Sequence, residues 1–218
     1  MKIKDLFDLQ KTLAKDYFEK YIYPWEVLPD ISAIIISLAE NLPFEYKEVK
    51  MGVFIHESAS VSRACEINGP CIIGKKTQIR PGAYIRGSAL IGENCVIGNS
   101  TEIKNTILFD GVQVPHYNYV GDSILGYRAH LGAGAVISNV KSDKSEVFSF
   151  DENQNRVETG LVKCGGFLGD HAEIGCHSVI TPGAVIGKCS NVYPLSLVRG
   201  VVPPHSILKT GNIIVNKS

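Results

Sequence analysis

A six-residue hydrophobic repeat constrains this chain more than any other feature. Between residues 53 and 109, a branched apolar residue recurs at every sixth position. These anchors are Ile55, Val61, Ile67, Ile73, Ile79, Ile85, Ile91, Ile97 and Ile103, and Phe109 ends the run. A period of six fits neither an amphipathic helix nor an alternating strand. It is typical of a parallel β-helix, in which each hexad supplies a short strand and a corner.

Small side chains stand four positions after the anchors and indicate how the coils pack. They are Ala59, Cys65, Cys71, Thr77, Ala83, Ala89, Cys95 and Thr101. Three hexads make one triangular coil, so residues 18 apart should stack one coil above another. The anchors are then expected to fill a narrow prism, and the small residues to occupy the space that remains. The expected fold is therefore mainly β.

Composition narrows the possible partners and the compartment. Lys and Arg total 22, as do Asp and Glu, so charge favours neither nucleic acid nor an anionic membrane. The longest apolar run, residues 31–39, is too short to span a bilayer, and no signal peptide is expected, since the first residues lack a basic stretch followed by an apolar core. The six cysteines include no CxxC pair, and three occupy small-residue positions of the hexads. Reduced thiols in the cytoplasm are expected.

Residues 1–47 lack the hexad and are expected to form a helical extension. A first helix is predicted from the apolar face of Leu6, Leu9, Leu13 and Tyr17. A second helix should begin after Asp30 as its cap, carry an apolar stripe to Leu42 and stop at Pro43. We expect the two helices to cover one open end or flank of the prism rather than to act as a substrate lid.

The repeat itself spans residues 48–208 and is interrupted twice, before a tail at 209–218. The register slips across residues 114–122, and a break in a sustained repeat often marks a functional loop. Residues 138–166 form a longer insertion. Within it, residues 146–150 and 156–158 are expected to pair as a hairpin around 151–153.

Arg86 and Lys104 lie 18 residues apart, and each follows an inward anchor. They should stack on the outside of adjacent coils, about 5 Å apart, where like charges repel unless an anion or a carboxylate lies between them. The pair indicates a phosphate site or, equally, a solvated pair relieved by Glu102.

Around the slip the sequence resembles a known family. The segments that carry the resemblance are Lys104-Asn105, Val114 to Asp122, Leu131 to Gly134, and Asn139. They are similar to the acetyltransferase domain of bifunctional N-acetylglucosamine-1-phosphate uridyltransferases and of their archaeal sugar-1-phosphate relatives. The resemblance covers residues 53 to about 208. It implies a left-handed β-helix, a homotrimer whose sites draw on neighbouring chains, and transfer of an acetyl group from acetyl-CoA to the amine of glucosamine 1-phosphate.

The resemblance also implies roles for single residues on the sugar side. His116 matches the catalytic histidine, and an imidazole that titrates near neutrality suits the removal of a proton from an ammonium group. Tyr119 matches a tyrosine that contacts the sugar phosphate, and Asn139 an asparagine that holds the amino sugar. The remaining matches are Lys104 for the phosphate-binding lysine, Arg86 or Arg80 for the arginine, and Lys144, with Lys141 as the alternative, for a later lysine.

On the donor side, Ala133 lies where the family uses backbone groups against acetyl-CoA. The resemblance places Asp170 one coil above Ala133, and Lys188 one coil above Asp170, at the next two positions that face acetyl-CoA. The family has small residues at both positions. Arg199 is a candidate for pairing with a phosphate of coenzyme A, or is a solvated surface residue. The acetyl-transfer step is not expected to require a metal.

Two other function classes are weighed against this interpretation. A non-catalytic scaffold or sugar-nucleotide-binding β-helix would keep the hexads, but it would not need the histidine, tyrosine and asparagine that are present. A metal enzyme resembling the γ-class carbonic anhydrases would need three suitably spaced histidines. His171 and His177 are six residues apart and so fall on adjacent faces. No glycine-rich nucleotide domain precedes the prism, so synthesis of UDP-sugars is not expected.

Overall fold

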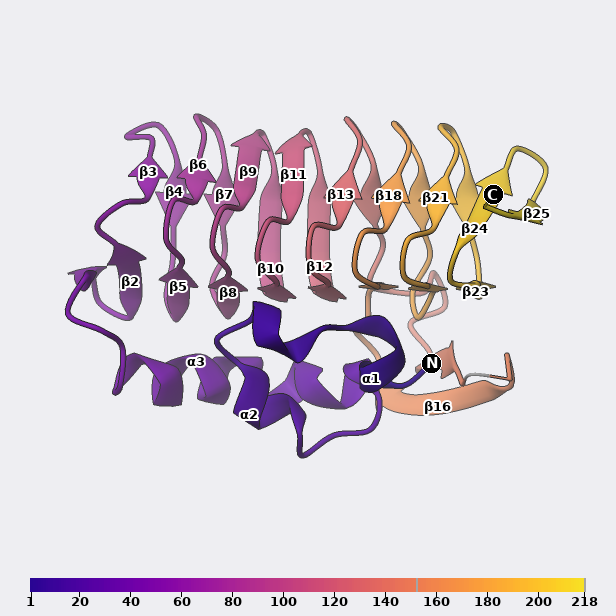
Figure 1. Cartoon of the computed structure of the whole chain (residues 1–218), viewed down its shortest axis with the longest axis horizontal. Helices are drawn as coiled ribbons and strands as arrows, with labels where there is room; N and C mark the ends of the chain where they lie inside the picture. Colours follow the sequence, from indigo (N-terminus) through magenta and orange to yellow (C-terminus); the bar gives the residue numbers. More distant parts are fainter. Residues whose placement is uncertain (152, 218) are drawn as a thin grey trace.

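The hexads fold into stacked triangular coils, as their six-residue period predicts (Figure 1). The structure is a computed structural model that describes residues 1–151 and 153–217. Short strands pair in parallel with the strands one coil away, so that Ile55 lies beside Ile73 and Ile73 beside Ile91. The strands line up as three faces of a prism, named the first, second and third face in chain order. The corner that follows each face takes the same number.

The first face consists of β2 (Val53–His56), β5 (Cys71–Ile73), β8 (Ala89–Ile91), the ends of β10 (Glu102–Leu108) and β12 (Tyr119–Leu125), β17 (Phe167–Leu168), β20 (Val185–Ile186) and β23 (Val201–Val202). The second face consists of β3 (Ser60–Val61), β6 (Gln78–Ile79), β9 (Val96–Asn99), β11 (Gln113–His116), β13 (His130–Leu131), β18 (Glu173–Ile174), β21 (Asn191–Val192) and β24 (Ser206–Lys209). The third face consists of β4 (Glu66–Ile67), β7 (Tyr84–Ile85), the starts of β10 and β12, β14 (Val136–Ile137), β19 (Val179–Ile180) and β22 (Leu197–Val198).

The anchors fill the prism, and the small residues between them complete its packing. Ile73, Ile85 and Ile97 are fully buried in one continuous cluster that runs through the coils. Thr77 is buried as well, and its hydroxyl donates to the Gly92 carbonyl at 2.7 Å while accepting from the Cys95 N–H at 2.9 Å. A small polar residue is tolerated inside the prism because its hydroxyl is fully hydrogen-bonded there.

The two coils that follow Ile91 are each one residue shorter than the hexad rule predicts, which corrects two of the sequence predictions. Leu108, and not Phe109, pairs with Ile91 and points into the prism, so the third corner that precedes Leu108 has lost one residue. The register therefore slips first at Asn105, before residues 114–122. Phe109 is left outside the prism.

The same corner is shortened again in the next coil. Val120 and Leu125 are separated by five residues, and both pair with the corresponding residues of β10. Asn105 and Asp122 make these tight corners with φ angles of 47° and 49°. This left-handed region is one that Asn and Asp enter more readily than most side chains.

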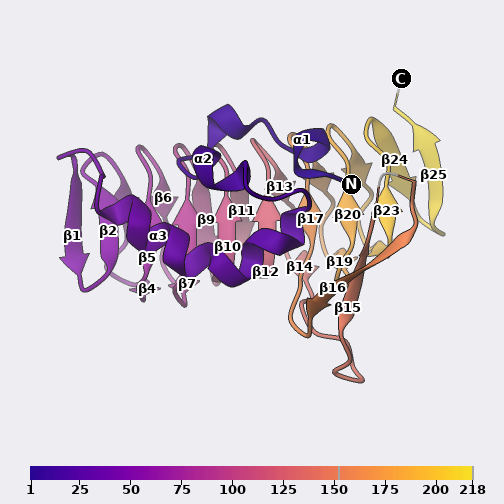
Figure 2. The ribbon, with the colours of Figure 1, turned by 90° about the horizontal axis from the view of Figure 1, so that it is seen from below.

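The N-terminal extension covers the first face of the prism, which confirms the flank position (Figure 2). The outward side chains of that face, including Leu90, Ile107 and Phe167, pack with Trp25 and Ile31 in a second hydrophobic cluster. The elements of the extension are α1 (Ile3–Leu6), η1 (Leu9–Lys11), α2 (Lys15–Phe18), η2 (Pro24–Asp30) and α3 (Ile31–Ala39).

The single helix predicted across residues 6–17 is wrong, because the prism takes up the backbone groups that a helix would use. The Leu6 carbonyl accepts from the Asp170 N–H at 3.0 Å, and the Asp8 N–H donates to the Asp170 carboxylate at 2.7 Å. Helix α3 ends at Ala39, before the predicted Leu42. The Asp30 carboxylate accepts from the Tyr21 hydroxyl at 2.6 Å and makes no side-chain cap.

Antiparallel strands occupy the two ends of the prism and the insertion. Strand β1 (Tyr46–Lys50) pairs with β2, and β25 (Ile213–Asn216) folds back on β24, so part of the predicted tail is a strand. Strands β15 (Val147–Phe150) and β16 (Arg156–Leu161) form the predicted hairpin. Glu152, which was predicted to lie in the turn of this hairpin, and Ser218 lie outside the described residues. No helix of the described residues is long and apolar enough to cross a membrane.

Candidate functional site

A buried carboxylate organises the third corner of the prism. Asp122 is 4% exposed, and three side chains from other coils contact it. The Lys104 ammonium lies 3.1 Å from its Oδ2, the Asn105 amide donates to Oδ1 at 2.9 Å, and the Asn139 amide donates to Oδ2. A buried carboxylate that is both ion-paired and hydrogen-bonded holds its partners in a fixed arrangement. Lys104 and Asn139, predicted separately, are thus brought together.

The same network reaches the third face and the N-terminal extension. The Asn139 side chain hydrogen-bonds the Tyr119 hydroxyl, which lies over Gly121. A Cβ at Gly121 would come within 2.5 Å of that hydroxyl, so only glycine leaves room for it. On the other side, the Asn105 amide donates to the Leu28 carbonyl at 3.3 Å. Lys104, Asn105, Asp122 and Asn139 are called the polar corner below. The extension therefore supports the polar corner through its contact with Asn105.

The Tyr119 phenol is held in its neutral form. Burial, followed by the negative charges of Asp122 and Glu102, raises the pKa of Tyr119 above its usual value. Desolvation and nearby anions both disfavour the phenolate. Tyr119 is therefore a hydroxyl that can donate a hydrogen bond to a bound anion.

The stacked Arg86 and Lys104 each have a carboxylate partner. The Arg86 guanidinium lies 2.7 Å from Glu102, and Lys104 pairs with Asp122. These carboxylates relieve the repulsion that the sequence left open, so the stacking of two cations does not by itself require a phosphate. Arg86 and Lys104 nevertheless occupy the same corner, whereas Arg80 lies at the second corner, where its N–H bonds the Ile97 carbonyl.

His116 lies exposed at the second corner, at the other edge of the third face from the Asp122 network. Pro115 precedes His116, and its backbone packs closely against Gly98 in the coil below. A Cβ at Gly98 would lie 1.5 Å from the Pro115 carbonyl oxygen, so a side chain there would displace the segment that presents the imidazole. Tyr117 follows with a φ of 52° and turns the chain away.

The coil above His116 carries Ala133 and Gly134, as the predicted donor site requires. The Gly134 N–H donates to the His116 carbonyl at 3.0 Å, and the Ala133 carbonyl accepts from the His177 N–H at 2.9 Å in the next coil. A ligand that contacts the backbone at Ala133 would therefore lie one coil above the backbone of His116.

Asp170 and Lys188 do not lie above Ala133, which corrects the predicted stacking. Both stand at the first corner, where the coil below Asp170 carries Tyr127 and not Ala133. The Asp170 carboxylate accepts from the Tyr127 and Asp8 N–H groups and pairs with Lys188 at 3.2 Å. The prediction counted residues from Ala133 to Asp170 across the insertion at residues 138–166, and the length of that insertion is not a whole number of coils. The observed contacts of these two side chains fasten the N-terminal extension.

The last two predicted binding residues lie on the insertion and above the polar corner. Lys144 is exposed in a turn with a φ of 56°, and its N–H bonds the Lys141 carbonyl at 3.0 Å. Arg199 is exposed at the third corner, several coils above Lys104, beside the inserted hairpin.

Comparison with known proteins identifies the prism. Residues 50–147 match the family model described as the EIF2B subunit epsilon LbH domain. The parallel coils observed over those residues are the coils of such a domain. This stretch is a left-handed β-helix domain. The handedness that the resemblance implied is thereby supported, together with the predicted fold class.

The β-helix and its extension have relatives among curated bifunctional enzymes. A bifunctional sugar-1-phosphate nucleotidylyltransferase/acetyltransferase from Sulfurisphaera tokodaii is 31% identical over an alignment of 213 residues, which covers 89% of this chain and 52% of the relative. A bifunctional protein GlmU from Methanocaldococcus jannaschii is 32% identical over an alignment of 198 residues, which covers 85% of this chain and 48% of that protein. The chain spans about half the length of the curated relatives it matches.

A more distant likeness is found among solved structures. PerB from Caulobacter crescentus, in complex with CoA and GDP-perosamine, is 19% identical, with a TM-score of 0.39 over 75% of this chain and 57% of that one. At this distance the likeness says nothing about the chemistry of the β-helix.

Asp122 and Asn105 were missed as site residues, although the sequence holds a signal for both. Leu108 and Leu125 each follow the preceding anchor by five residues instead of six. Counting hexads from Leu108 would have located both short corners and, within them, the two polar residues with left-handed backbone. The hydrogen bonds that join them across coils could not be read from spacing.

Asp122 should be the most sensitive position of the polar corner. Replacing Asp122 with Ala removes the buried acceptor that the half-buried side chains of Lys104, Asn105 and Asn139 share, and we expect it to cost about 3–5 kcal/mol of unfolding free energy. Chemical denaturation of Asp122→Ala, Asp122→Asn and wild type measures this. Glu102→Gln, which removes only an exposed partner of Arg86, is the control and should leave the unfolding midpoint nearly unchanged. Equal midpoints for Asp122→Ala and wild type would contradict the assignment.

Proposed function

We propose that this chain transfers an acetyl group from acetyl-CoA to the amine of a phosphorylated amino sugar such as glucosamine 1-phosphate. The observation that carries the proposal is the arrangement at the third face. An exposed imidazole, His116, lies at one edge, and the hydroxyl, amide and ammonium groups of Tyr119, Asn139 and Lys104 lie at the other. The curated relative from Sulfurisphaera tokodaii, which carries acetyltransferase in its name, supports the same reaction class.

The proposed chemistry needs one proton acceptor and one positioned thioester. The amino group of the sugar is protonated at neutral pH and must lose a proton before its nitrogen can attack. His116 takes that proton as general base, the nitrogen attacks the thioester carbonyl, and the carbon–sulfur bond breaks. The attacking nitrogen loses a second proton as the amide forms, and the departing thiolate of coenzyme A takes up that proton and becomes a thiol. Backbone groups at Ala133, one coil above His116, are suitably placed to hold the acetyl end of the donor.

The polar corner supplies the groups that would hold the sugar phosphate. Lys104 retains donor capacity beyond its contact with Asp122, because an ammonium has three hydrogens. Tyr119 is kept protonated and can donate to a phosphate oxygen. Asn139 is held by Asp122 and can direct its carbonyl oxygen toward the sugar. Arg86, at the same corner, adds a second cation.

A homotrimer would complete this site with groups from a neighbouring chain. His116 and the Asp122 network lie at opposite edges of one face, and that face carries exposed apolar side chains suited to packing. They are Tyr84, Val179 and Leu197 on the face and Tyr117, Tyr193 and Leu195 at the second corner. Exposed apolar side chains that gather on one face and its edge suit contact with another protein.

Light scattering of the full chain at micromolar concentration should give three times the mass of one chain. Leu197→Glu places a charge in the packed face and should shift the mass toward that of one chain, while Ile22→Glu, on the exposed N-terminal extension, should not. A wild-type mass equal to one chain would rule out the shared site.

Removal of the proposed base should abolish most of the turnover without unfolding the chain. A placed general base contributes about 10²–10⁴ in rate, so His116→Ala should lose that much kcat in a thiol-release assay with acetyl-CoA and glucosamine 1-phosphate. His205→Ala changes an exposed histidine at the first corner and is the matched control.

A panel of amino sugars, their phosphates and their nucleotide-linked forms should be assayed in parallel. If none releases thiol, and His116→Ala binds the same ligands as wild type, a sugar-nucleotide-binding module replaces the enzyme.

The phosphate contact should show as a change in apparent substrate affinity. Arg86→Ala and Lys104→Ala should each raise KM for glucosamine 1-phosphate about tenfold, since each removes a charge-assisted hydrogen bond. Arg80→Ala, at the other corner, tests the alternative arginine. Equal kcat/KM on glucosamine and glucosamine 1-phosphate would discard the phosphate contact altogether.

A further inference from the structure

A cleft lies between the inserted hairpin and the third corner of the prism. Its volume is about 410 Å³. It begins at Ser138, next to Asn139, and continues past Thr181 to Arg199. Those residues follow β14, β19 and β22, so the cleft extends over two coils beyond Asn139, roughly 10 Å. It therefore prolongs the proposed sugar site in the direction of the C-terminal coils.

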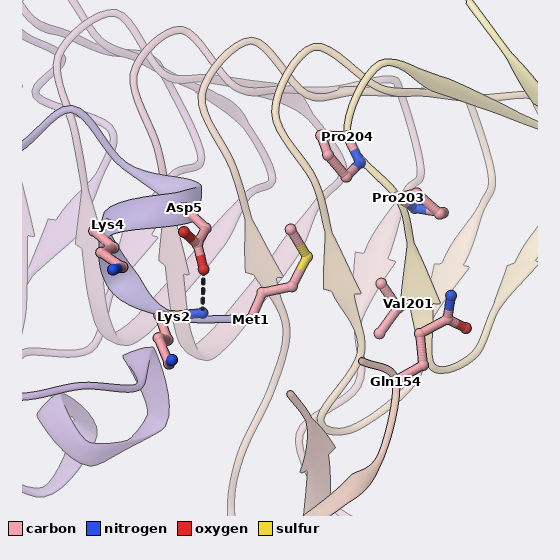
Figure 3. Close-up of a pocket in the computed structure, with 8 residues that line it drawn as sticks. All are labelled: Met1, Lys2, Lys4, Asp5, Gln154, Val201, Pro203 and Pro204. Carbon is pink, nitrogen blue, oxygen red and sulfur yellow. Dashed lines mark hydrogen bonds between the residues drawn. The ribbon is translucent and has the colours of Figure 1, made fainter. Parts of the chain in front are cut away.

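The hairpin wall of the cleft is fastened to the prism on both sides. Ser149 is buried, and its hydroxyl donates to the Gly183 carbonyl at 2.9 Å, while Val147 is 1% exposed. From the far side, the amino group of Met1 donates to the Phe150 carbonyl. Figure 3 shows the hollow on that far side, which is lined by residues that include Met1, Val201 and Gln154. Strand β15 therefore presents its cleft side chains from a fixed position.

Those side chains are aromatic. Phe148 and Phe150 line the cleft, with ring centroids 5.6 Å apart in an edge-to-face arrangement. The guanidinium of Arg156 covers Phe148 at 3.4 Å from its ring centroid. Phe150 carries no such cation, and its ring packs 3.5 Å from the Cβ position of Gly200. The valines 140, 147 and 179 extend this apolar wall.

Two cations stand beside the aromatic wall. Lys141 donates to the Ser145 hydroxyl and the Glu146 carbonyl, which leaves one ammonium hydrogen for a ligand. Arg199 is exposed at the opposite end, and no ion pair joins it to a carboxylate of residues 1–151 or 153–217. An apolar aromatic surface flanked by two available cations matches a ligand that has a flat ring and a phosphate.

We propose that this cleft binds a nucleoside phosphate, with the base against Phe150 and the phosphate between Lys141 and Arg199. A sugar phosphate alone would leave the aromatic wall in water. Resting on the proposed acetyl transfer, the inference allows two sources of this chemistry. One is the nucleoside diphosphate of a nucleotide-linked amino sugar, and the other is the 3′-phosphoadenosine end of coenzyme A.

Calorimetric titration of the full chain tests the cleft without any assay of turnover. The probes are UDP, adenosine 3′,5′-bisphosphate and, as reference, inorganic phosphate. Arg199→Ala should raise Kd for the nucleotide that binds about tenfold or more. Phe150→Leu keeps the apolar volume but loses the stacking surface, and should raise it by a similar factor. Arg63→Ala removes an equally exposed arginine from the first coil and should change nothing.

Coenzyme A and dephospho-coenzyme A distinguish the two sources. If Arg199→Ala weakens coenzyme A but not the dephospho form, the cleft holds the 3′-phosphate of the donor. If it weakens UDP and leaves coenzyme A unchanged, the cleft holds the acceptor nucleotide. The inference is overturned if neither nucleotide binds wild type more tightly than inorganic phosphate, or if Arg199→Ala and Phe150→Leu leave Kd unchanged. If the nucleotide binds but no acceptor releases thiol from acetyl-CoA, the proposed reaction is contradicted and the proposed binding cleft is not.

Discussion

The stacking of branched apolar anchors inside the prism is the interaction on which the rest of the molecule depends. Each anchor is buried against the anchors of the coils above and below, and the parallel hydrogen bonds between coils hold that register. Because the interior is closely packed, an anchor cannot be moved along the chain without exposing it or leaving a void. The two five-residue steps that end at Leu108 and Leu125 are tolerated because they occur at the same corner in consecutive coils.

That doubled shortening is also what makes the third corner chemically distinctive. At these two shortened corners the residues with left-handed backbone are Asn105 and Asp122, and their side chains meet across coils. A corner that elsewhere is filled by small residues becomes a buried carboxylate with three polar partners. The bond from Asn105 to the Leu28 carbonyl ties this corner to the extension, so helix packing on the first face supports the chemistry beside the third.

The period of six was sufficient to predict the faces and the direction of the anchors, and the two runs on either side of residues 151–153 were sufficient to predict the inserted hairpin, because each is a local pattern. The failures came from contacts between distant segments. The helix across residues 6–17 was lost to hydrogen bonds with Asp170, about 160 residues away. Asp170 itself was placed above Ala133 because an insertion of unknown path separates the two coils. His116 and Asn139 could be nominated from sequence, but the carboxylate that positions Asn139 required the register of the coils.

The terminal strands have a consequence for how such a prism behaves in a crowded solution. A solenoid of parallel coils could in principle add further copies at either end, as a cross-β fibre does. Here the first coil is followed outward by β1, which runs antiparallel, contains a bulge between Glu48 and Lys50, and carries Lys47. A bulged, lysine-bearing edge is a poor template for another strand. At the other end, β25 is only four residues long and runs antiparallel to β24. Polymerisation along the coil axis is thereby discouraged, and growth by lateral packing of the exposed faces remains available.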